Sequence, residues 1–114
     1  MQYALFIYED ESFYGPDKAG PQIQEIYSKH MAFNEKLGAR RLGGAGLNAA
    51  AAATTVRTVA NTKSVQSGPV VTLKQALSGF YLVEVTDLDE AIEVAKQIPV
   101  LQDGAIEIRP MMGV

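Results

Sequence analysis

The sequence predicts one α+β domain over residues 1–114, with an antiparallel sheet and both helices on the same face of it. Residues 78–111 carry the clearest pattern, in which an apolar strand, an amphipathic helix and an alternating strand follow one another. A second strand–helix pair occupies residues 3–38. Two such units around a single sheet are typical of a ferredoxin-like α+β sandwich. Between them, a β-hairpin insertion is expected at about residues 54–67.

The first unit begins with a strand and continues into a long helix. Tyr3–Tyr8 is apolar on both alternating faces, which indicates a strand covered on both sides. Residues 9–20 are acidic and lack a helical period, so we expect a loop. Pro21 suits a first helical turn and Gly38 a C-terminal stop, which predicts a helix over about residues 20–38. Its apolar stripe consists of Ile23, Ile26, Tyr27, His30, Phe33 and Leu37.

The middle of the chain is less regular. Residues 41–47 are rich in glycine, which indicates a short strand or a loop. The alanines at 49–53 favour helix, but a strand pattern follows directly, so we expect an extended connector or one helical turn. Residues 54–59 begin the hairpin, and residues 61–66 turn the chain and form its second strand. Residues 72–77 are expected to form a turn or a short helix.

The last unit has well-marked boundaries. Residues 80–85 combine aromatic, aliphatic and β-branched side chains, as a largely buried strand does. Asp87 and Glu90 have the spacing of a capping box at a helix start, and Pro99 ends that helix. Residues 105–109 alternate like a half-exposed strand. The apolar stripe of the helix is expected to consist of Leu88, Ala91, Ile92, Ala95 and Ile98.

The predicted sheet has a second face that no helix of the chain is left to cover. The strands at 3–8 and 80–85 are apolar on both faces, whereas both helices must pack on one. Large apolar faces usually mark an interaction site. A second copy of the chain covers such a face most economically, so we expect a homodimer whose sheets face one another.

Composition and charge exclude several classes of protein. An apolar content of 47% and a charged content of 20% are typical of a soluble globular domain. A formal charge of −3 provides no basic footprint for nucleic acid, and the Arg40-Arg41 doublet is expected to be a solvated helix end. The N-terminus lacks a secretory signal, and no apolar run approaches the ~20 residues that span a bilayer. We therefore expect a cytoplasmic protein without nucleic-acid or membrane partners.

Side chains for metal or covalent chemistry are scarce. The chain has no cysteine, which excludes disulfides, thiolate catalysis and cysteine-based zinc sites. His30 is its single histidine, so one chain cannot form a multi-histidine metal site. The glycines at 43–46 match neither a P-loop nor a dinucleotide fingerprint and instead indicate close backbone packing or a bend. We expect no metal and no organic cofactor.

A series of spaced motifs runs through the second half of the chain. It includes Thr54-Thr55-Val56-Arg57, Gly68-Pro69, Gly79-Phe80-Tyr81-Leu82, Asp87-Leu88-Asp89-Glu90-Ala91, Ile98-Pro99 and Arg109-Pro110-Met111. Together with the opening strand and His30, this series resembles the YCII-related family, in its DGPF-domain branch. The resemblance covers nearly the whole chain. It implies the fold of the dimeric α+β barrel superfamily, in agreement with the argument for a dimer.

The resemblance also implies a candidate site. Members of the family are mostly of unknown function, and a histidine and an aspartate typical of it have prompted the suggestion of enzymatic activity. His30 matches the histidine. Ser67 stands where the Asp-Gly-Pro-Phe motif has its aspartate, and Val70 where it has phenylalanine. Thr72 stands where a glutamate is common. The acid of a His–Asp pair is therefore absent at this position.

His30 allows two interpretations. Its imidazole can serve as a general acid or base if a substrate reaches it, or it can be a hydrogen-bonded histidine of the core or an interface. Without the aspartate, Glu84 or Glu107 could orient the ring, because each interrupts an otherwise apolar strand. Either glutamate could equally form a structural pair with Arg57 or Arg109.

The remaining candidates have structural alternatives too. Ser67 could be a nucleophile, but Ser-Gly-Pro supplies neither a base nor an oxyanion hole, and a turn serine is the alternative. Arg57 and Arg109 could clamp an anionic ligand through bidentate contacts, or be solvated or paired. Tyr8 and Tyr81 could line a pocket or pack within the sheet.

Two functions of different classes follow. The first is cofactor-independent acid–base chemistry on a small organic molecule, in which His30 moves the proton and Arg57 or Arg109 holds a negative charge. The second is a non-catalytic regulatory module that binds a ligand or a protein partner, which the replacement of the family aspartate by Ser67 favours. A metal-dependent enzyme is a distant third, since carboxylates would have to supply most ligands.

Overall fold

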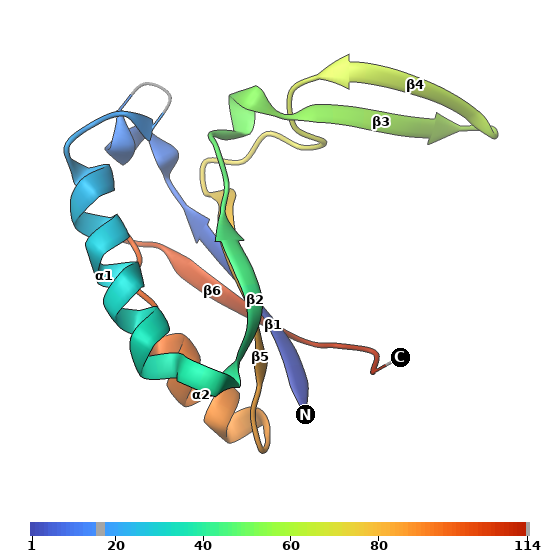
Figure 1. Cartoon of the computed structure of the whole chain (residues 1–114). Helices are drawn as coiled ribbons and strands as arrows, with labels where there is room; N and C mark the ends of the chain where they lie inside the picture. The colour runs from blue at the N-terminus through green and yellow to red at the C-terminus, as the bar shows by residue number, and fades with distance from the viewer. Residues whose placement is uncertain (16–17, 114) are drawn as a thin grey trace.

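A computed structural model of the protein describes residues 1–15 and 18–113. Its main sheet is antiparallel, with strand order β2-β5-β1-β6, and a separate two-stranded sheet pairs β3 with β4 (Figure 1). The elements are β1 Gln2–Glu9, a 3₁₀ turn Glu11–Tyr14, α1 Gln22–Leu37, a 3₁₀ turn Gly38–Arg40, β2 Arg41–Gly46, a 3₁₀ turn Ala50–Ala52, β3 Thr54–Val59, β4 Thr62–Ser67, β5 Ala76–Glu84, α2 Leu88–Gln97 and β6 Ala105–Pro110.

The predicted ferredoxin-like α+β fold is confirmed. Both helices lie on the same side of the sheet, and the core fills the space between them and the inner face of β1 and β5 (Figure 1). Leu5 and Val83, near the middle of these strands, are fully buried. The dimeric barrel stays a prediction. The expected loop at 9–20 contains the 3₁₀ turn Glu11–Tyr14, and its residues 16 and 17 lie outside the described residues.

The sheet face that points away from the helices is called the open face here. Antiparallel partners share a face, so Ala4 lies beside Leu82, and Phe6 beside Phe80. Polar residues of β6 border this apolar centre, because Glu107 lies opposite Phe6 and Arg109 opposite Ala4. The open face also includes Tyr8, Ala45 and Ala105.

Helix α1 ends as predicted, at Gly38, whose φ of 57° is in the left-handed region and whose N–H bonds to the carbonyl of Asn34. Ile26, Phe33 and Leu37 form its buried face. The prediction for Tyr27 is wrong, since this side chain is 64% exposed. At about 100° per residue, Tyr27 lies a quarter-turn away from the line through the buried side chains.

Helix α2 begins with the predicted capping box. A side-chain oxygen of Asp87 accepts from the Glu90 N–H at 2.9 Å, and a Glu90 oxygen accepts from the Thr86 N–H at 2.7 Å. The expected buried stripe is partly wrong, because Leu88 is 49% exposed and Val94 is 2% exposed. The stripe is centred on the Val94 side of the helix, which leaves Leu88 at its border. Ala91, Val94, Ala95 and Ile98 are buried.

Strand β5 starts earlier than the sequence predicts. Residues 72–77 contain no helix, and Ala76 and Leu77 already pair with Glu9 and Tyr8 of β1. This extension results from long-range pairing with β1, which local strand propensity does not indicate. Beside it, Gly44 of β2 has a φ of 151°, and a Cβ there would lie 2.6 Å from the Phe80 carbonyl oxygen. The glycine-rich stretch therefore forms a strand that packs closely on β5.

The β3–β4 hairpin, residues 54–67, is called the arm here. Val56 pairs with Val65, and the two-residue turn has positive φ at Ala60 (49°) and Asn61 (67°), as a type I′ turn requires. The alanine run before it forms one 3₁₀ turn, one of the two expected forms. Figure 1 shows the arm projecting from one end of the sheet, on the side opposite the helices.

Candidate functional site

A cavity of about 570 Å³ lies between α1 and the sheet, near the end of β2 and the first half of β5. It holds the only histidine of the chain and several charged or phenolic side chains, which come from elements far apart in the sequence. Its polar lining comprises Glu9, Tyr14, Lys18, Tyr27, His30, Asn34, Arg41, Asn48, Ser78 and Tyr81, and its apolar lining includes Ile7, Ile23, Ile26 and Met31.

His30 and Tyr81 form the centre of this cavity wall. His30 projects from the middle of α1, and its Nδ1 lies 2.8 Å from the hydroxyl oxygen of Tyr81 on β5. The two rings are stacked, with centroids 5.9 Å apart and planes 23° from parallel. Phe33, one helical turn after His30, packs edge-on against Tyr81 at 5.1 Å. Packing therefore holds the two rings with their polar atoms within hydrogen-bond distance.

Burial favours the neutral form of both groups. It lowers the pKa of His30, and the negative charge of Glu9 and a hydrogen bond to the Pro99 carbonyl oppose this only in part. Burial raises the pKa of Tyr81, opposed by the positive charge of Arg41 and a hydrogen bond from the Asn34 side chain. Near neutral pH, a phenol therefore faces an uncharged imidazole. When Tyr81 donates, Nδ1 accepts with its lone pair and the ring proton resides on Nε2.

A buried carboxylate braces one end of the cavity. Glu9, the last residue of β1, is 2% exposed. The Tyr14 hydroxyl lies 2.9 Å from both of its oxygens, and the Leu101 N–H donates to it at 2.8 Å. Burial and the hydrogen bond from its hydroxyl to Glu9 strongly raise the pKa of Tyr14. The brace thus connects β1, the following 3₁₀ turn and the segment between α2 and β6.

Two cations line the cavity in different ways. The Lys18 ammonium is already bound by three groups of the same chain. Its Nζ lies 3.1 Å from a Glu11 oxygen, and it donates to the Leu47 carbonyl at 2.8 Å and to the Ser78 hydroxyl at 2.9 Å. Arg41 has its Cζ 5.9 Å from the centroid of the Tyr81 ring. Among the described residues, the only hydrogen bond of its guanidinium is from Nη2 to the Gly44 carbonyl. Arg41 therefore retains N–H donors for an anionic group.

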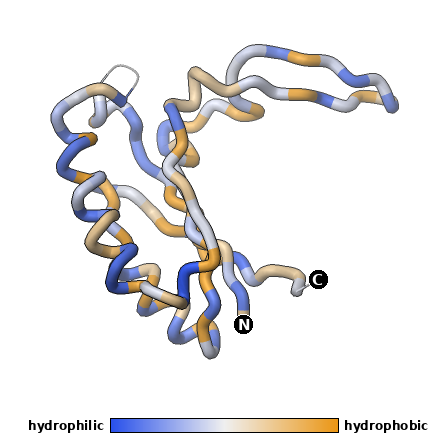
Figure 2. Tube along the Cα trace, viewed as in Figure 1, coloured by the Kyte–Doolittle hydropathy of each residue, from blue (hydrophilic) through white to orange (hydrophobic). Residues whose placement is uncertain are grey.

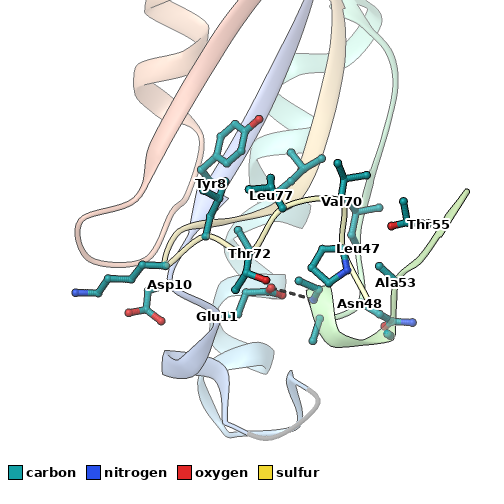
Figure 3. A pocket seen from close by; sticks show the side chains of 18 of the residues that line it. Tyr8, Asp10, Glu11, Leu47, Asn48, Ala53, Thr55, Val70, Thr72 and Leu77 are labelled. Carbon is teal, nitrogen blue, oxygen red and sulfur yellow. Dashed lines mark hydrogen bonds between the residues drawn. The ribbon is translucent and has the colours of Figure 1, made fainter. Parts of the chain in front are cut away.

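A second cavity, of about 810 Å³, lies at the base of the arm (Figure 3). Its walls are mainly aliphatic, and the acids Asp10 and Glu11 lie along one side of it. Asp10 accepts from the Ser12 hydroxyl and N–H, which lower its pKa, while Glu11 accepts from the Ala50 N–H. This cavity is larger, but it contains neither the histidine nor a polar pair like His30 and Tyr81. The smaller cavity is the better candidate for chemistry.

The structure brings two of the predicted site residues together, His30 and Tyr81, and places the others elsewhere. Tyr8 lines the cavity at the base of the arm. Glu84 pairs with the N-terminal amine at 2.8 Å, which lowers its pKa. Glu107 and Arg109 pair with each other at 3.4 Å on the open face. Neither glutamate lines the His30 cavity, so Glu9 is the nearest analogue of the expected acid.

The two predicted residues of the arm also lie outside this cavity. Arg57 donates to the Gln66 side chain at 3.1 Å and to the Val70 carbonyl at 2.8 Å. Ser67 ends β4 and pairs with Thr54, the first residue of β3. Arg57 thus ties the arm to the segment that follows it, and Ser67 lies where the arm closes.

Sequence reasoning missed most of the polar cavity wall. The sequence predicts a solvated helix end at Arg40-Arg41, a short strand or loop over residues 41–47, and a loop around Glu9 and Lys18. One signal was present in the sequence: Asn34 follows His30 by four residues, and this spacing places two polar side chains next to each other on a helix. Nothing local indicated that Glu9, Tyr14 and Leu101 would meet, because their contacts depend on the fold.

The lowered pKa of His30 predicts a specific loss of stability in acid. The unfolded chain binds a proton near the ordinary pKa of 6.5, whereas the folded chain resists it. Stability should therefore fall as the pH drops below about 6.5, and it should level off only below the folded-state pKa. Urea unfolding of the wild type and His30→Gln at pH 5 and pH 8 measures this effect. Because the chain has one histidine, equal pH dependence of both proteins would contradict the prediction.

Two further properties of the described residues bear on function. No helix among residues 1–15 and 18–113 is both long and apolar enough to cross a membrane. Over the same residues, no three histidine, aspartate or glutamate side chains gather in a way that could hold a metal ion.

Comparison with known proteins identifies the family. The model of the YCII-related domain matches residues 1–113. An uncharacterised protein of Rhizobium meliloti (strain 1021) is 31% identical over 117 residues, an alignment that covers 97% of this chain and 92% of that protein. The DGPF branch stays a prediction. With a match over nearly its whole length, the chain belongs to the YCII-related family.

Proposed function

We propose that the protein catalyses proton transfer on a small organic molecule bound in the His30 cavity. The observation that carries this proposal is the 2.8 Å contact between His30 Nδ1 and the Tyr81 hydroxyl in the wall of a cavity large enough for a small molecule. A proton relay needs an acid and a base within hydrogen-bond distance of each other, and this pair satisfies that condition.

The proposed step moves two protons and leaves one electron pair behind. The substrate X–H bond breaks, and its proton bonds to the Tyr81 oxygen. At the same time the Tyr81 O–H bond breaks, and that proton passes to Nδ1 of His30. The electron pair stays on the substrate, which becomes an anion, while His30 becomes an imidazolium. The Pro99 carbonyl and the charge of Glu9 favour this imidazolium. The reverse sequence returns a proton to the substrate.

Arg41 is the residue that we assign to the developing negative charge. Its guanidinium lies beside the Tyr81 ring and lines the same cavity. Guanidinium N–H groups bind oxyanions in a planar, bidentate geometry, so a carboxylate or an enolate oxygen suits this position. Lys18 contributes positive charge, but its contacts with Glu11, Ser78 and Leu47 hold it in place.

We also infer that the protein acts as a homodimer joined through the open face. Phe6, Phe80 and Leu82 are only partly buried there, although they lie in the centre of the sheet. Both helices cover the opposite face, so a second sheet is the simplest cover for these side chains. The His30 cavity lies on the helix side, and it remains accessible in such a dimer.

An NMR titration of the single histidine tests the proposed function. We expect the His30 ring signals of tag-free protein to titrate with a pKa below 6.5, and to shift when a carboxylate-bearing member of a metabolite library binds. Arg41→Gln, with the same library, serves as the matched control and should abolish the carboxylate response. A ring that neither titrates nor responds to any compound would contradict the proposal. In that case the non-catalytic binding module would be the better interpretation.

A further inference from the structure

The arm carries an apolar pair that nothing in the described chain covers. Val56 and Val65 lie directly opposite each other, so they share one face of the hairpin. They are 63% and 71% exposed. A two-stranded hairpin by itself is marginally stable at best in water. The arm therefore requires a surface to pack against, and residues 1–15 and 18–113 supply none for its valine face.

The direction of the arm indicates where that surface is. Figure 1 shows that the arm leaves the end of the sheet on the side opposite α1 and α2. It therefore overhangs the open face and forms a corner with it. Any molecule that docks on the open face comes into reach of the arm.

A second apolar surface lies at the base of the arm, and we call it the root patch. It surrounds the larger cavity, and Figure 3 shows several of its side chains directed into that space. Figure 2 shows apolar segments on both strands of the arm and along the connection that follows it. The root patch consists of Leu47, Val70, Val71, Leu73 and Leu77, all between 37% and 64% exposed.

We propose that the arm of each copy packs on the root patch of a second copy of this chain, and that each copy both gives and receives an arm. This proposal rests on the homodimer inferred above. In a two-fold dimer, a contact between two different surfaces necessarily occurs twice. The paired arms would thus cover both valine pairs and both root patches, and they would close the open side of the larger cavity.

The dimensions of strands and sheets agree with this contact. Stacked sheets lie about 10 Å apart, and a strand advances about 3.3 Å per residue. A position about three residues along the arm therefore reaches the level of the partner's sheet. Val56 on the outgoing strand and Val65 on the returning strand occupy that position.

Charge favours a second copy over other occupants. The arm carries Arg57 and Lys63 and no acidic residue, whereas the whole chain has a formal charge of −3. Asp10, Glu11 and Lys74 line the cavity next to the root patch, and Glu11 is paired with Lys18, so the charges at this edge balance within the chain. With the two cations of the arm set apart, the remaining residues carry a formal charge of −5, so a basic arm and the acidic body of a second copy attract each other, and such complementarity steers association.

Sedimentation analysis of arm variants tests the contact. Val56→Asn combined with Val65→Asn should weaken the dimer at least ~10-fold, and Val70→Asn combined with Leu73→Asn should do the same, since both remove apolar interface contacts. Val59→Asn is the matched control, because Val59 is also exposed (68%) but lies on the other face of the arm. Its dissociation constant should stay within ~2-fold of the wild type. All these positions are exposed, so the variants should fold.

A cross-link provides a second readout, because the chain has no cysteine of its own. Val65→Cys combined with Leu73→Cys should form covalent dimers under mild oxidation, and the single variants should form far fewer. A monomeric wild type would overturn both the homodimer and the arm contact. A wild-type dimer that the arm and root-patch variants leave unchanged would overturn the arm contact alone. Disulfides formed within single chains, or a series of covalent oligomers larger than the dimer, would overturn the reciprocal pairing.

Discussion

Tyr81→Phe is expected to reduce turnover by ~10²–10⁴-fold, the usual contribution of a positioned acid–base group. The substitution removes the hydroxyl that lies 2.8 Å from His30 Nδ1 but retains the ring that packs against Phe33. The fold should therefore persist, with a loss of only ~1 kcal/mol for the hydrogen bond. Initial rates with the substrate identified by the NMR screen measure the first effect, and thermal unfolding measures the second.

Two controls separate the relay from a general loss of structure. Tyr8→Phe is the matched variant, since Tyr8 lies on the neighbouring strand but lines the other cavity. It should leave turnover unchanged. His30→Gln should reduce turnover as much as Tyr81→Phe does, and the double variant should be no worse than either single one, because the two groups act as a unit. Additive losses would show that Tyr81 and His30 act separately.

Glu9→Ala should destabilise the protein by about 2–5 kcal/mol, because it leaves two buried donors without an acceptor. The Tyr14 hydroxyl and the Leu101 N–H both bond to this carboxylate, which is 2% exposed. Urea unfolding measures the effect. Glu9→Gln keeps one acceptor oxygen and should lose less than the alanine variant.

The control for this prediction is Glu93→Ala on α2, where the glutamate is 67% exposed and pairs with Lys96 at 3.3 Å. Its stability should change by no more than ~0.5 kcal/mol, as is usual for surface substitutions. Equal destabilisation at both positions would mean that the brace contributes nothing beyond helix or strand propensity. If Glu9→Ala is as stable as the wild type, the hydrogen bonds of Glu9 do not stabilise the cavity wall, and the prediction is wrong.

Local sequence patterns could predict the elements that carry the site residues, but not the contacts between them. The placement of His30 on the first helix and Tyr81 on a buried strand could be predicted, since apolar periodicity determines both. The contact between these two side chains could not be predicted from the sequence, because it depends on which faces of the helix and the strand pack together. Likewise, Arg57 and Arg109 have the chemistry to bind an anion, yet Arg41 is the arginine that lines the cavity. Its position follows from the pairing of β2 with β5.

The sequence by itself determined the features that depend on neighbouring residues. These include the capping box of Asp87 and Glu90, the helix stop at Gly38, the hairpin within residues 54–67 and the ferredoxin-like order of elements. The tertiary structure alone decided the exact buried side of each helix, the early start of β5 and the joining of Glu9 to Tyr14 and Leu101. Capping and turn formation are local interactions, whereas burial and long-range hydrogen bonds depend on residues up to 92 positions apart in the chain.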